Sequence, residues 1–577
     1  VYKRQDENGQ RYAVLAFPKT KVKKIAVEVV QWDGSPTNIS ASEIAFYDYY
    51  SVDSEIKALF ADDAFTTLAQ GVTQEDIDAI RVKLDDEDSY YVDSSIFADE
   101  LSLAEALLAK DTSKLGIIKN DFVSIDTSGD VKHISDWSPL GIVGFAGKKV
   151  AIYADIPEGE TLHLIPTQYY SEANSLIGKT IELTRGRNII EIEKIGNLKV
   201  TAGGSFYYRY SGNKGDQIKL HIRDTEGAVK EIPTLELYNW YELSETERKA
   251  RISKYIDDLV AYAPNKLNNK DTNPANSTEI SGRNILLSLP ADQVLAGITA
   301  ATPDKDAQIE KLYNNMLAWE EVIKITHTTY GLDNPLDVLK SRQNIRYMRM
   351  FANAFMYAAG SHIGVGYGST GALVQGKPTS VTGEGNANGL FGWGIAHEIG
   401  HNMDRLGKAE ITNNIYSLMM QTYDGKDNML PSRLELSDKY QDIYKKVAVG
   451  DKGMSNDGFT QLGMYWQLHL AYDNGADDKA NGPLSFYNKL FKVYDSGKVN
   501  GFTGDDKFAV AASMAAEKDL TEFFTKWGMD LSDAAKAEMK NYSQEERKIQ
   551  YLTDESRRYR LNGGTGIQAM EFDAAAS

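Results

Sequence analysis

The chain has 577 residues, of which 42% are hydrophobic and 25% charged, with a formal net charge of −19. This length exceeds what one hydrophobic core supports, so we expect about two to four domains, and the composition excludes global disorder. The negative field repels phosphate backbones and so excludes nucleic acid as a partner, and the absence of cysteine excludes disulfides, thiolate nucleophiles and cysteine-type zinc sites.

The first 50 residues contain two segments in which polar and apolar residues alternate, 24–32 and 43–50. A turn signal, Asp-Gly-Ser-Pro at 33–36, separates them. Two strands do not form a stable unit, so we interpret residues 1–50 as the last strands of a β-sandwich that begins upstream. The sequence starts at Val1 and shows no signal peptide, so we expect it to be a piece of a longer chain.

Residues 51–112 are predicted to be a small helical connector. Apolar residues such as Ile77, Ile80 and Leu84 recur at helical spacing, with acidic residues at many other positions. Residues 113–240 instead contain short alternating segments separated by Gly-containing turns, which predicts an antiparallel β-sandwich. The expected strands cover 150–156, 161–165, 180–195, 205–210 and 217–223.

Helical patterns dominate the following region, 241–552. Ser244 and Glu247 form a capping box that opens a helix over residues 244–261. No apolar run is long enough to span a bilayer, so no membrane span is expected. The further expected elements are a strand over 284–289, a helix over 312–325, a buried helix over the aromatic- and Met-rich segment 344–359, and a loop or edge strand over the glycine-rich segment 360–376.

Residues 397–401, His-Glu-Ile-Gly-His, contain the pattern H-E-x-x-H. His397 and His401 are four residues apart, so a helix places both imidazoles on one face, where they can hold one metal ion. Zinc lowers the pKa of a bound water to about 7, and the neighbouring carboxylate of Glu398 can remove its proton. The pattern therefore predicts a catalytic zinc site. The alternative is a helix whose two histidines bind no metal.

Catalytic zinc takes three protein ligands, and Glu410 is the candidate for the third. Gly407 is a helix stop, and a second helix that begins near Lys408 would bring Glu410 back to the ion. Asn414, one turn further on, is a candidate to hydrogen-bond Glu410, and Asp404 is a candidate to orient a ligand imidazole. For both polar residues, a helix cap or an exposed position is an equally good interpretation.

Hydrolysis also needs a donor for the developing oxyanion. A predicted helix over residues 463–472 offers Tyr465, His469 and Tyr472, although aromatic packing also explains these side chains. His362, like His469, falls in a segment that is expected to line the cleft. No loop pattern requires calcium. The remaining histidines are interpreted as structural: His133, His163, His221 and His327.

Two segments carry a family resemblance: residues 392–402, Gly-Trp-Gly-Ile-Ala-His-Glu-Ile-Gly-His-Asn, and residues 410–417, Glu-Ile-Thr-Asn-Asn-Ile-Tyr-Ser. They resemble the enhancin-like, mucin-degrading zinc metallopeptidases, family sixty of the metallopeptidases. The resemblance covers about residues 113–552. It implies a gluzincin, in which a downstream glutamate completes the zinc site. The family's metal ligands and base then fall on His397, His401, Glu410 and Glu398.

The resemblance also implies a location, a substrate and a domain order. It implies a secreted or cell-surface bacterial enzyme that cuts host glycoproteins, mucins above all, beside an O-glycosylated Ser or Thr. A monomer is expected. The expected fold is a multidomain α+β chain: the tail of a galactose-binding-like, carbohydrate-binding β-sandwich at 1–50, the helical connector at 51–112, an antiparallel β-sandwich at 113–240, a mainly helical zincin-like (gluzincin) catalytic domain at 241–552, and a tail at 553–577.

A sugar subsite is expected where the chain leads into the zinc helix. Tyr367, Trp393 and Asn386 lie there, and an aromatic ring with an amide suits an amino sugar; His362 joins this candidate set. Packing of Trp393 under the helix is the alternative. Two other functions stay open: a glycan-binding, adhesin-like protein with an unused peptidase fold, and a metallopeptidase that ignores glycans.

Overall fold

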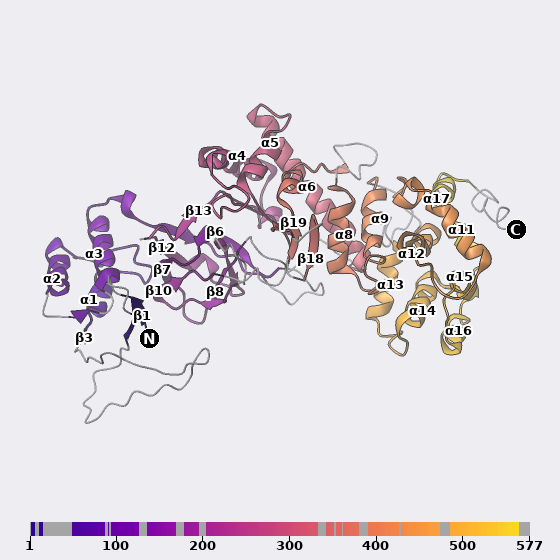
Figure 1. Ribbon diagram of the computed structural model, residues 1–577, viewed down its shortest axis with the longest axis horizontal. Coiled ribbons are helices and arrows are strands. Elements are labelled where there is room, and N and C mark those ends of the chain that lie inside the picture. Colours follow the sequence, from indigo (N-terminus) through magenta and orange to yellow (C-terminus); the bar gives the residue numbers. More distant parts are fainter. Residues whose placement is uncertain are drawn as a thin grey trace, which may run out of the picture.

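The fold is a row of layers that follows the chain order, from short helices through a β-sandwich and a single mixed sheet to a helical end (Figure 1). The computed structural model describes residues 2–5, 11–14, 49–86, 90–91, 94–125, 135–168, 178–194, 203–224, 226–332, 342–350, 354–360, 362–379, 390–425, 428–473 and 485–564. No helix within these ranges is long and apolar enough to cross a membrane.

The N-terminal segment contributes two small strand pairs. Strands β1 (Tyr2–Gln5) and β2 (Arg11–Val14) pair antiparallel, and β3 (Tyr49–Tyr50) pairs parallel with β4 (Tyr90–Tyr91). The strand predicted over 24–32 and most of that predicted over 43–50 lie outside the described residues. The β-sandwich remnant over residues 1–50 therefore stays a prediction.

The predicted helical connector is confirmed as three helices, α1 (Asp53–Ala58), α2 (Gln74–Leu84) and α3 (Ser94–Leu108). Their apolar residues, including Ile56 and Leu101, are buried in a core of their own. This core also contains Tyr153 of the sandwich, so the helices pack directly on the neighbouring domain.

Ion pairs join three acidic residues of the connector, Asp53, Asp99 and Glu100, to the sandwich. Arg187 of the sandwich binds both carboxylate oxygens of Glu100, and its Nη1 lies 2.6 Å from Asp53 Oδ1. The Tyr153 hydroxyl donates to Glu100 at 2.8 Å. Arg223 binds Asp99 through two hydrogen bonds of 2.8 and 2.9 Å. Burial raises the pKa of Glu100, so this carboxylate depends on its bound cation and hydroxyl to stay charged.

Arg187→Ala is expected to destabilise the protein by about 3–5 kcal/mol, because it leaves the Glu100 charge buried without a cation. The Glu100 side chain is 0% exposed and that of Arg187 15%. The shift of the urea unfolding transition measures this loss. Lys57→Ala is the matched control, because Lys57 is 52% exposed and its pair with Asp53 is worth less than about 1 kcal/mol. Equal shifts for the two variants would contradict the prediction.

The predicted antiparallel β-sandwich is confirmed over the described part of residues 113–240. One sheet has the order β10-β7-β12-β5 and the other β13-β6-β11-β8-β9. Apolar residues from both sheets, such as Ile142 and Ile152, fill the space between them. The strands are β5 (Ile117–Asn120), β6 (Ser138–Phe145), β7 (Lys149–Asp155), β8 (Leu162–Pro166), β9 (Ile181–Glu182), β10 (Gly186–Glu191), β11 (Gly203–Tyr210), β12 (Lys219–Arg223) and β13 (Val229–Glu231).

A mixed sheet of six strands follows, in the order β14-β15-β16-β17-β19-β18. Strand β18 lies at its edge and pairs antiparallel with β19, whereas β17 pairs parallel with both of its neighbours. The strands are β14 (Thr234–Glu236), β15 (Thr278–Ser281), β16 (Ile285–Leu289), β17 (Gln343–Tyr347), β18 (Met356–Ala359) and β19 (His362–Val365).

This sheet corrects two predictions. The helix predicted over 344–359 is wrong, because β17 and β18 occupy that segment. All five residues of β17 are buried, so the strand lacks the alternation that marks a half-exposed strand. The edge strand predicted within 360–376 is also wrong, because β19 lies inside the sheet and a 3-10 helix over Tyr367–Val374 follows it.

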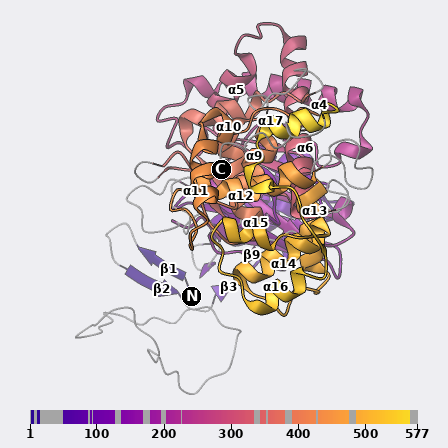
Figure 2. The same cartoon turned by 90° about the vertical axis from the view of Figure 1, so that its right-hand side faces the viewer.

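Helices cover one face of the mixed sheet and form the C-terminal end of the molecule (Figures 1 and 2). The Ser244–Glu247 capping box opens its first helix, α4, as predicted. The helices are α4 (Glu245–Tyr262), α5 (Ala291–Thr299), α6 (Lys305–Tyr330), α8 (Gly392–Met403), α9 (Asn414–Thr422), α10 (Arg433–Leu436), α11 (Lys439–Val449), α12 (Gly458–Tyr472), α13 (Ser485–Asp495), α14 (Gly504–Ala516), α15 (Thr521–Lys526), α16 (Asp533–Met539) and α17 (Asp554–Leu561).

The predicted tail begins with structure that belongs to the helical end. Helix α17 lies within residues 553–577, and the buried carboxylate of Asp554 accepts hydrogen bonds from Ser432, Tyr440 and Trp466. The packed fold therefore extends beyond residue 552.

The other face of the mixed sheet packs on the sandwich. Trp137 and Tyr207 of the sandwich share a buried cluster with Met348 of the sheet region. The Tyr207 hydroxyl lies 2.7 Å from both Glu279 and Ser288, which are buried in the sheet. The sandwich thus supports the sheet from behind, while helix α8 packs across its front and meets the edge strand β18.

Candidate metal centre

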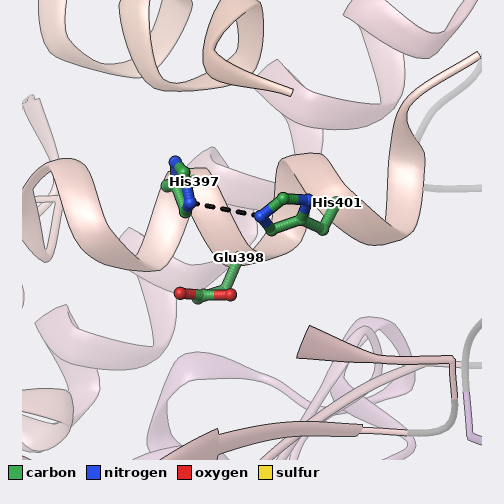
Figure 3. A group of neighbouring side chains, drawn as sticks. All are labelled: His397, Glu398 and His401. Atoms are coloured by element: carbon green, nitrogen blue, oxygen red, sulfur yellow. Dashed lines mark hydrogen bonds between the residues drawn. The ribbon is translucent and has the colours of Figure 1, made fainter. Parts of the chain in front are cut away.

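Helix α8 carries the H-E-x-x-H pattern, as predicted. Its apolar residues, including Ile395 and Ile399, are buried in the core under the mixed sheet. The imidazoles of His397 and His401 leave the helix on the same side and point toward one another, with the Glu398 carboxylate beside them (Figure 3). Their donor atoms lie within 4.8 Å of one another. The geometry of a helix is thus sufficient to direct one ring nitrogen of His397 and one of His401 toward the same point, where a metal ion could bind.

The glycine inside the pattern has a packing role. A Cβ atom on Gly400 would lie 2.2 Å from the backbone oxygen of Asn413, a distance that real Cβ atoms do not show. The missing side chain lets the chain at Asn413 approach the helix. The side-chain amide nitrogen of Asn413 then donates a hydrogen bond to the backbone carbonyl oxygen of His397 at 3.3 Å.

Gly400→Ala is expected to destabilise the protein by about 1–3 kcal/mol and to lower its metal affinity, because the new methyl group must push the 410–414 segment away from α8. Thermal unfolding and chelator competition measure the two effects. Gly368→Ala is the control, because nothing lies within 4 Å of a Cβ placed there. Unchanged metal affinity in Gly400→Ala would contradict the proposed coupling.

The chain returns to the helix and brings a third donor. Glu410 Oε1 lies 3.1 Å from His401 Nε2, and Glu410 Oε2 lies 3.3 Å from His397 Nε2. The two Nε2 atoms are 3.2 Å apart. Ligand atoms about 2.0–2.1 Å from a tetrahedral zinc ion are themselves separated by roughly 3.3 Å. The three residues therefore fit a zinc ion, and a cation explains why two imidazole nitrogens and a carboxylate face one another.

The route by which Glu410 arrives differs from the prediction. Helix α9 begins at Asn414, and Glu410 lies in the preceding turn in the left-handed region, at φ 65°. Asp404 does not orient an imidazole. Its carboxylate accepts hydrogen bonds from the backbone of Leu406 and Gly407 and from the Thr412 hydroxyl, so it stabilises the turn instead.

Asn414 contacts His397, one of the candidate ligands. Its side-chain oxygen lies 2.7 Å from His397 Nδ1, and its amide nitrogen donates to the backbone oxygen of Glu410 at 2.8 Å. A proton on Nδ1 leaves Nε2 free as a metal ligand. The nearer contact of Nδ1, the Asn414 oxygen, favours this tautomer, and Asn414 also binds the Glu410 turn. The predicted bond to the Glu410 carboxylate is replaced by one to its backbone.

A cavity of about 590 Å³ lies over the three candidate ligands. Glu398 and Asn402 of α8 face the edge strand β18 across it. Burial raises the pKa of Glu398, with the Glu410 charge acting in the same direction and His397 against it. Burial also lowers the pKa of His401, which favours the neutral imidazole that a metal requires. The cavity is lined by Met356, Tyr357, Ala358, Ala359, Gly360, His397, Glu398, His401, Asn402 and Glu410.

The three predicted oxyanion donors do not line this cavity. Tyr465 is buried and packs on Phe508, and the Tyr472 hydroxyl donates to Glu545 at 2.6 Å. His469 is buried with Asp473, whose carboxylate lies 2.9 Å from its Nδ1. Helix α12 is enclosed by other elements, so its polar groups bind inside the core.

Three of the four predicted sugar-binding residues, His362, Tyr367 and Trp393, do not line the cavity either. His362 is buried behind β18, where its Nε2 lies 2.8 Å from the Tyr357 hydroxyl and burial lowers its pKa to about 3. The Tyr367 hydroxyl donates to Asp292 at 2.5 Å. Trp393 is half-buried beside Phe459. Asn386 lies outside the described residues.

The structure adds residues to the site that sequence reasoning missed. Strand β18 forms one wall of the cavity, although its segment was predicted to be a helix. Asn413 and Asn402 also reach the site, and the Asn413 amide nitrogen lies 3.2 Å from His401 Nε2. The Asn413-Asn414 pair that follows Glu410 in the sequence could have indicated both residues as contacts of the site. Only Asn414 was predicted to reach it.

Comparison with solved structures shows the same fold in several bacterial proteins. The M60 catalytic domain of Clostridium perfringens ZmpB with its CBM32-1 and CBM32-2 domains has a TM-score of 0.63 and 24% identity, over 88% of this chain and 50% of that chain. The chain thus spans half the length of that structure. The M60 catalytic domain of C. perfringens ZmpC, in complex with the sialyl T antigen, has a TM-score of 0.58 and 24% identity, over 78% and 84% of the two chains.

A third structure, a metallopeptidase from Bacteroides thetaiotaomicron, has a TM-score of 0.56 and 18% identity, over 89% of this chain and 83% of that chain. A comparison with curated proteins gave no match. Residues 268–528, which include α8 and Glu410, match the family model of peptidase M60, enhancin and enhancin-like. Over residues 268–528, the chain is therefore similar to the peptidase M60, enhancin and enhancin-like family.

Proposed function

We propose that the protein is a secreted zinc endopeptidase that hydrolyses peptide bonds in O-glycosylated host proteins of the mucin type. One observation carries the catalytic part of this proposal. The Nε2 atoms of His397 and His401 lie 3.2 Å apart, and each lies 3.1–3.3 Å from one carboxylate oxygen of Glu410, at a cavity that Glu398 also lines.

The roles of the residues follow from their positions. His397, His401 and Glu410 would hold zinc, which when bound supplies a Lewis acid and lowers the pKa of a coordinated water. Glu398 accepts the proton of the attacking water and delivers it to the amine that leaves. Asn414 keeps the His397 proton on Nδ1, so that Nε2 stays available.

Strand β18 supports an extended peptide as the substrate. Among the described residues it pairs with β19 alone, and its residues form the cavity wall opposite α8. An unpaired strand edge can form main-chain hydrogen bonds with an added strand. Its last residues, Ala358 and Ala359, and the following Gly360 are small and leave room for substrate side chains.

The proposal of a glycoprotein substrate rests on the similarity of this chain to other proteins. The ZmpC domain that shares this fold was determined in complex with the sialyl T antigen, a glycan. The resemblance of the motif segments to mucin-degrading peptidases favours the same class of substrate, and secretion follows from where such substrates occur. A glycan-binding protein with an unused active site and a glycan-independent peptidase are the alternatives.

The test uses an O-glycosylated mucin-type peptide and its unglycosylated twin, with and without a zinc chelator, read by mass spectrometry. We expect chelator-sensitive cleavage beside the glycosylated residue in the glycopeptide alone. Cleavage of both peptides would retain the zinc peptidase and reject the glycan requirement. Binding of the glycopeptide without cleavage, at full zinc occupancy, would favour the glycan-binding alternative.

A further inference from the structure

The segment between helices α8 and α9 carries the chain away from the two histidines and brings it back with Glu410. We call this segment, residues 404–413, the return turn. Glu410 does little to hold it in place. Its side chain is 71% exposed, and its φ of 65° lies in the left-handed region that residues other than glycine adopt less readily. Contacts made by other residues of the return turn must therefore fix the position of the Glu410 carboxylate.

Arg405 anchors the start of the return turn to helices outside the metal centre. Its guanidinium binds both carboxylate oxygens of Asp495, the last residue of α13, and its Nη1 donates to the backbone oxygen of Tyr330 at 3.1 Å. The guanidinium carbon lies 5.0 Å from the ring centroid of Tyr330 and 4.9 Å from that of Phe491. The Arg405 side chain is only 18% exposed, so a carboxylate, a carbonyl and two rings together define its place.

A second ion pair anchors the middle of the return turn. Lys408 Nζ lies 2.8 Å from Asp505 Oδ1, in the first turn of α14. These two side chains are 31% and 41% exposed, so water weakens this pair more than it weakens the Arg405 contacts. Helices α13 and α14 pack on each other, and the far end of the turn is held to α8 through Asn413. Arg405 is thus the strongest link between the return turn and the helical end of the molecule.

We propose that Arg405 is a positioning residue, which fixes the return turn so that the Glu410 carboxylate lies at the two imidazoles. Without this anchor the carboxylate samples more positions, and a metal ion that binds has to order it at a cost in conformational entropy. Loss of a group that orients a metal ligand typically lowers metal affinity 10- to 100-fold. This inference rests on the zinc site of the proposed function and makes no use of the substrate.

The test measures zinc affinity by competition with a chromophoric chelator, in the absence of substrate. Arg405→Met keeps an apolar stem between the two rings and loses the guanidinium, so it is expected to lower zinc affinity by about tenfold or more. Arg405→Lys keeps a charge for Asp495 but loses the fork, and it is expected to give a smaller loss.

Arg223→Met is the matched control for a loss of stability. Arg223 binds Asp99 through two hydrogen bonds of 2.8 and 2.9 Å and donates to the backbone oxygen of Lys114 at 2.9 Å, which is the same set of polar contacts that Arg405 makes. It joins the sandwich to the connector, so its loss is expected to shift urea unfolding and leave zinc affinity unchanged. An equal fall in zinc affinity in Arg223→Met and Arg405→Met would overturn the inference, because lost stability alone would explain it.

A double-mutant cycle decides whether Arg405 acts through Glu410. In the Glu410→Ala background, Arg405→Met is expected to change zinc affinity by less than about twofold, because the carboxylate that Arg405 positions is gone. The same loss in both backgrounds, or wild-type affinity in Arg405→Met alone, would also overturn the inference.

Cleavage of the glycopeptide is scored separately and tells this failure from failure of the proposed function. If the wild type binds zinc and Arg405→Met weakens it through Glu410, yet neither protein cleaves, the positioning role stands and the proposed reaction is wrong. If the wild type cleaves and Arg405→Met binds zinc as tightly as the wild type, the reaction stands and the positioning role is wrong.

Discussion

Glu398→Gln is expected to lower kcat by about 10²- to 10⁴-fold while the protein keeps its bound metal. The amide has nearly the shape of the carboxylate but cannot accept the proton of the attacking water. The three candidate ligands, His397, His401 and Glu410, are unchanged, so metal content measured by mass spectrometry of the purified protein is expected to equal that of the wild type. Turnover of the glycopeptide measures the loss.

Glu546→Gln is the matched control for this change, because Glu546 is exposed and lies outside the cavity. It is expected to change neither turnover nor metal content. If Glu398→Gln kept kcat within about tenfold of the wild type at full metal occupancy, another group would have to act as the base.

His401→Ala and Glu410→Ala are each expected to lower zinc affinity by more than about 100-fold, beyond the 10- to 100-fold loss that follows removal of a group that only hydrogen-bonds a ligand. Each variant removes one of the three donors, and activity is expected to fall with metal content. Competition with a chromophoric chelator measures the affinity. His163→Ala, a change at an accessible histidine on β8 of the sandwich, is expected to leave it unaltered.

The Glu410 variant also decides which carboxylate is the third ligand. Donor atoms of Glu398 and the two histidines lie within 4.8 Å of one another, so Glu398 is the competing assignment. Glu410 lies nearer to both imidazoles, at 3.1 and 3.3 Å, although its side chain is 71% exposed. If Glu410→Ala kept its zinc and Glu398→Gln lost it, the roles of the two carboxylates would be exchanged.

Features that depend on residues close in sequence were predicted well. His397 and His401 are four residues apart, so any helix brings them together, and the same holds for the Ser244–Glu247 capping box. Glu410 was chosen by the same short-range logic, although α8 ends at Met403 rather than at Gly407 and Glu410 lies in a turn before α9. The alternating pattern of residues 113–240 predicted a sandwich because one face of each strand is buried.

Features set by neighbours distant in sequence were predicted poorly. Strand β17 is buried on both faces between β16 and β19, so it has no period from which to recognise a strand. The polar groups of α12 were predicted to face the cleft, yet other elements enclose that helix. Tyr472 contacts Glu545 and His469 contacts Asp473 instead.

The sequence by itself therefore determined the candidate chemistry that we propose for this protein: two histidines, a candidate base and a third candidate ligand, all within residues 397–410. Only the tertiary structure decided what surrounds that chemistry. The edge strand β18 enters from a segment that precedes α8, and Arg433 and Phe459 meet Trp393 from two later helices. The reason is physical: helical spacing is a short-range property, whereas a cavity wall depends on which elements pack together, and that depends on the whole core.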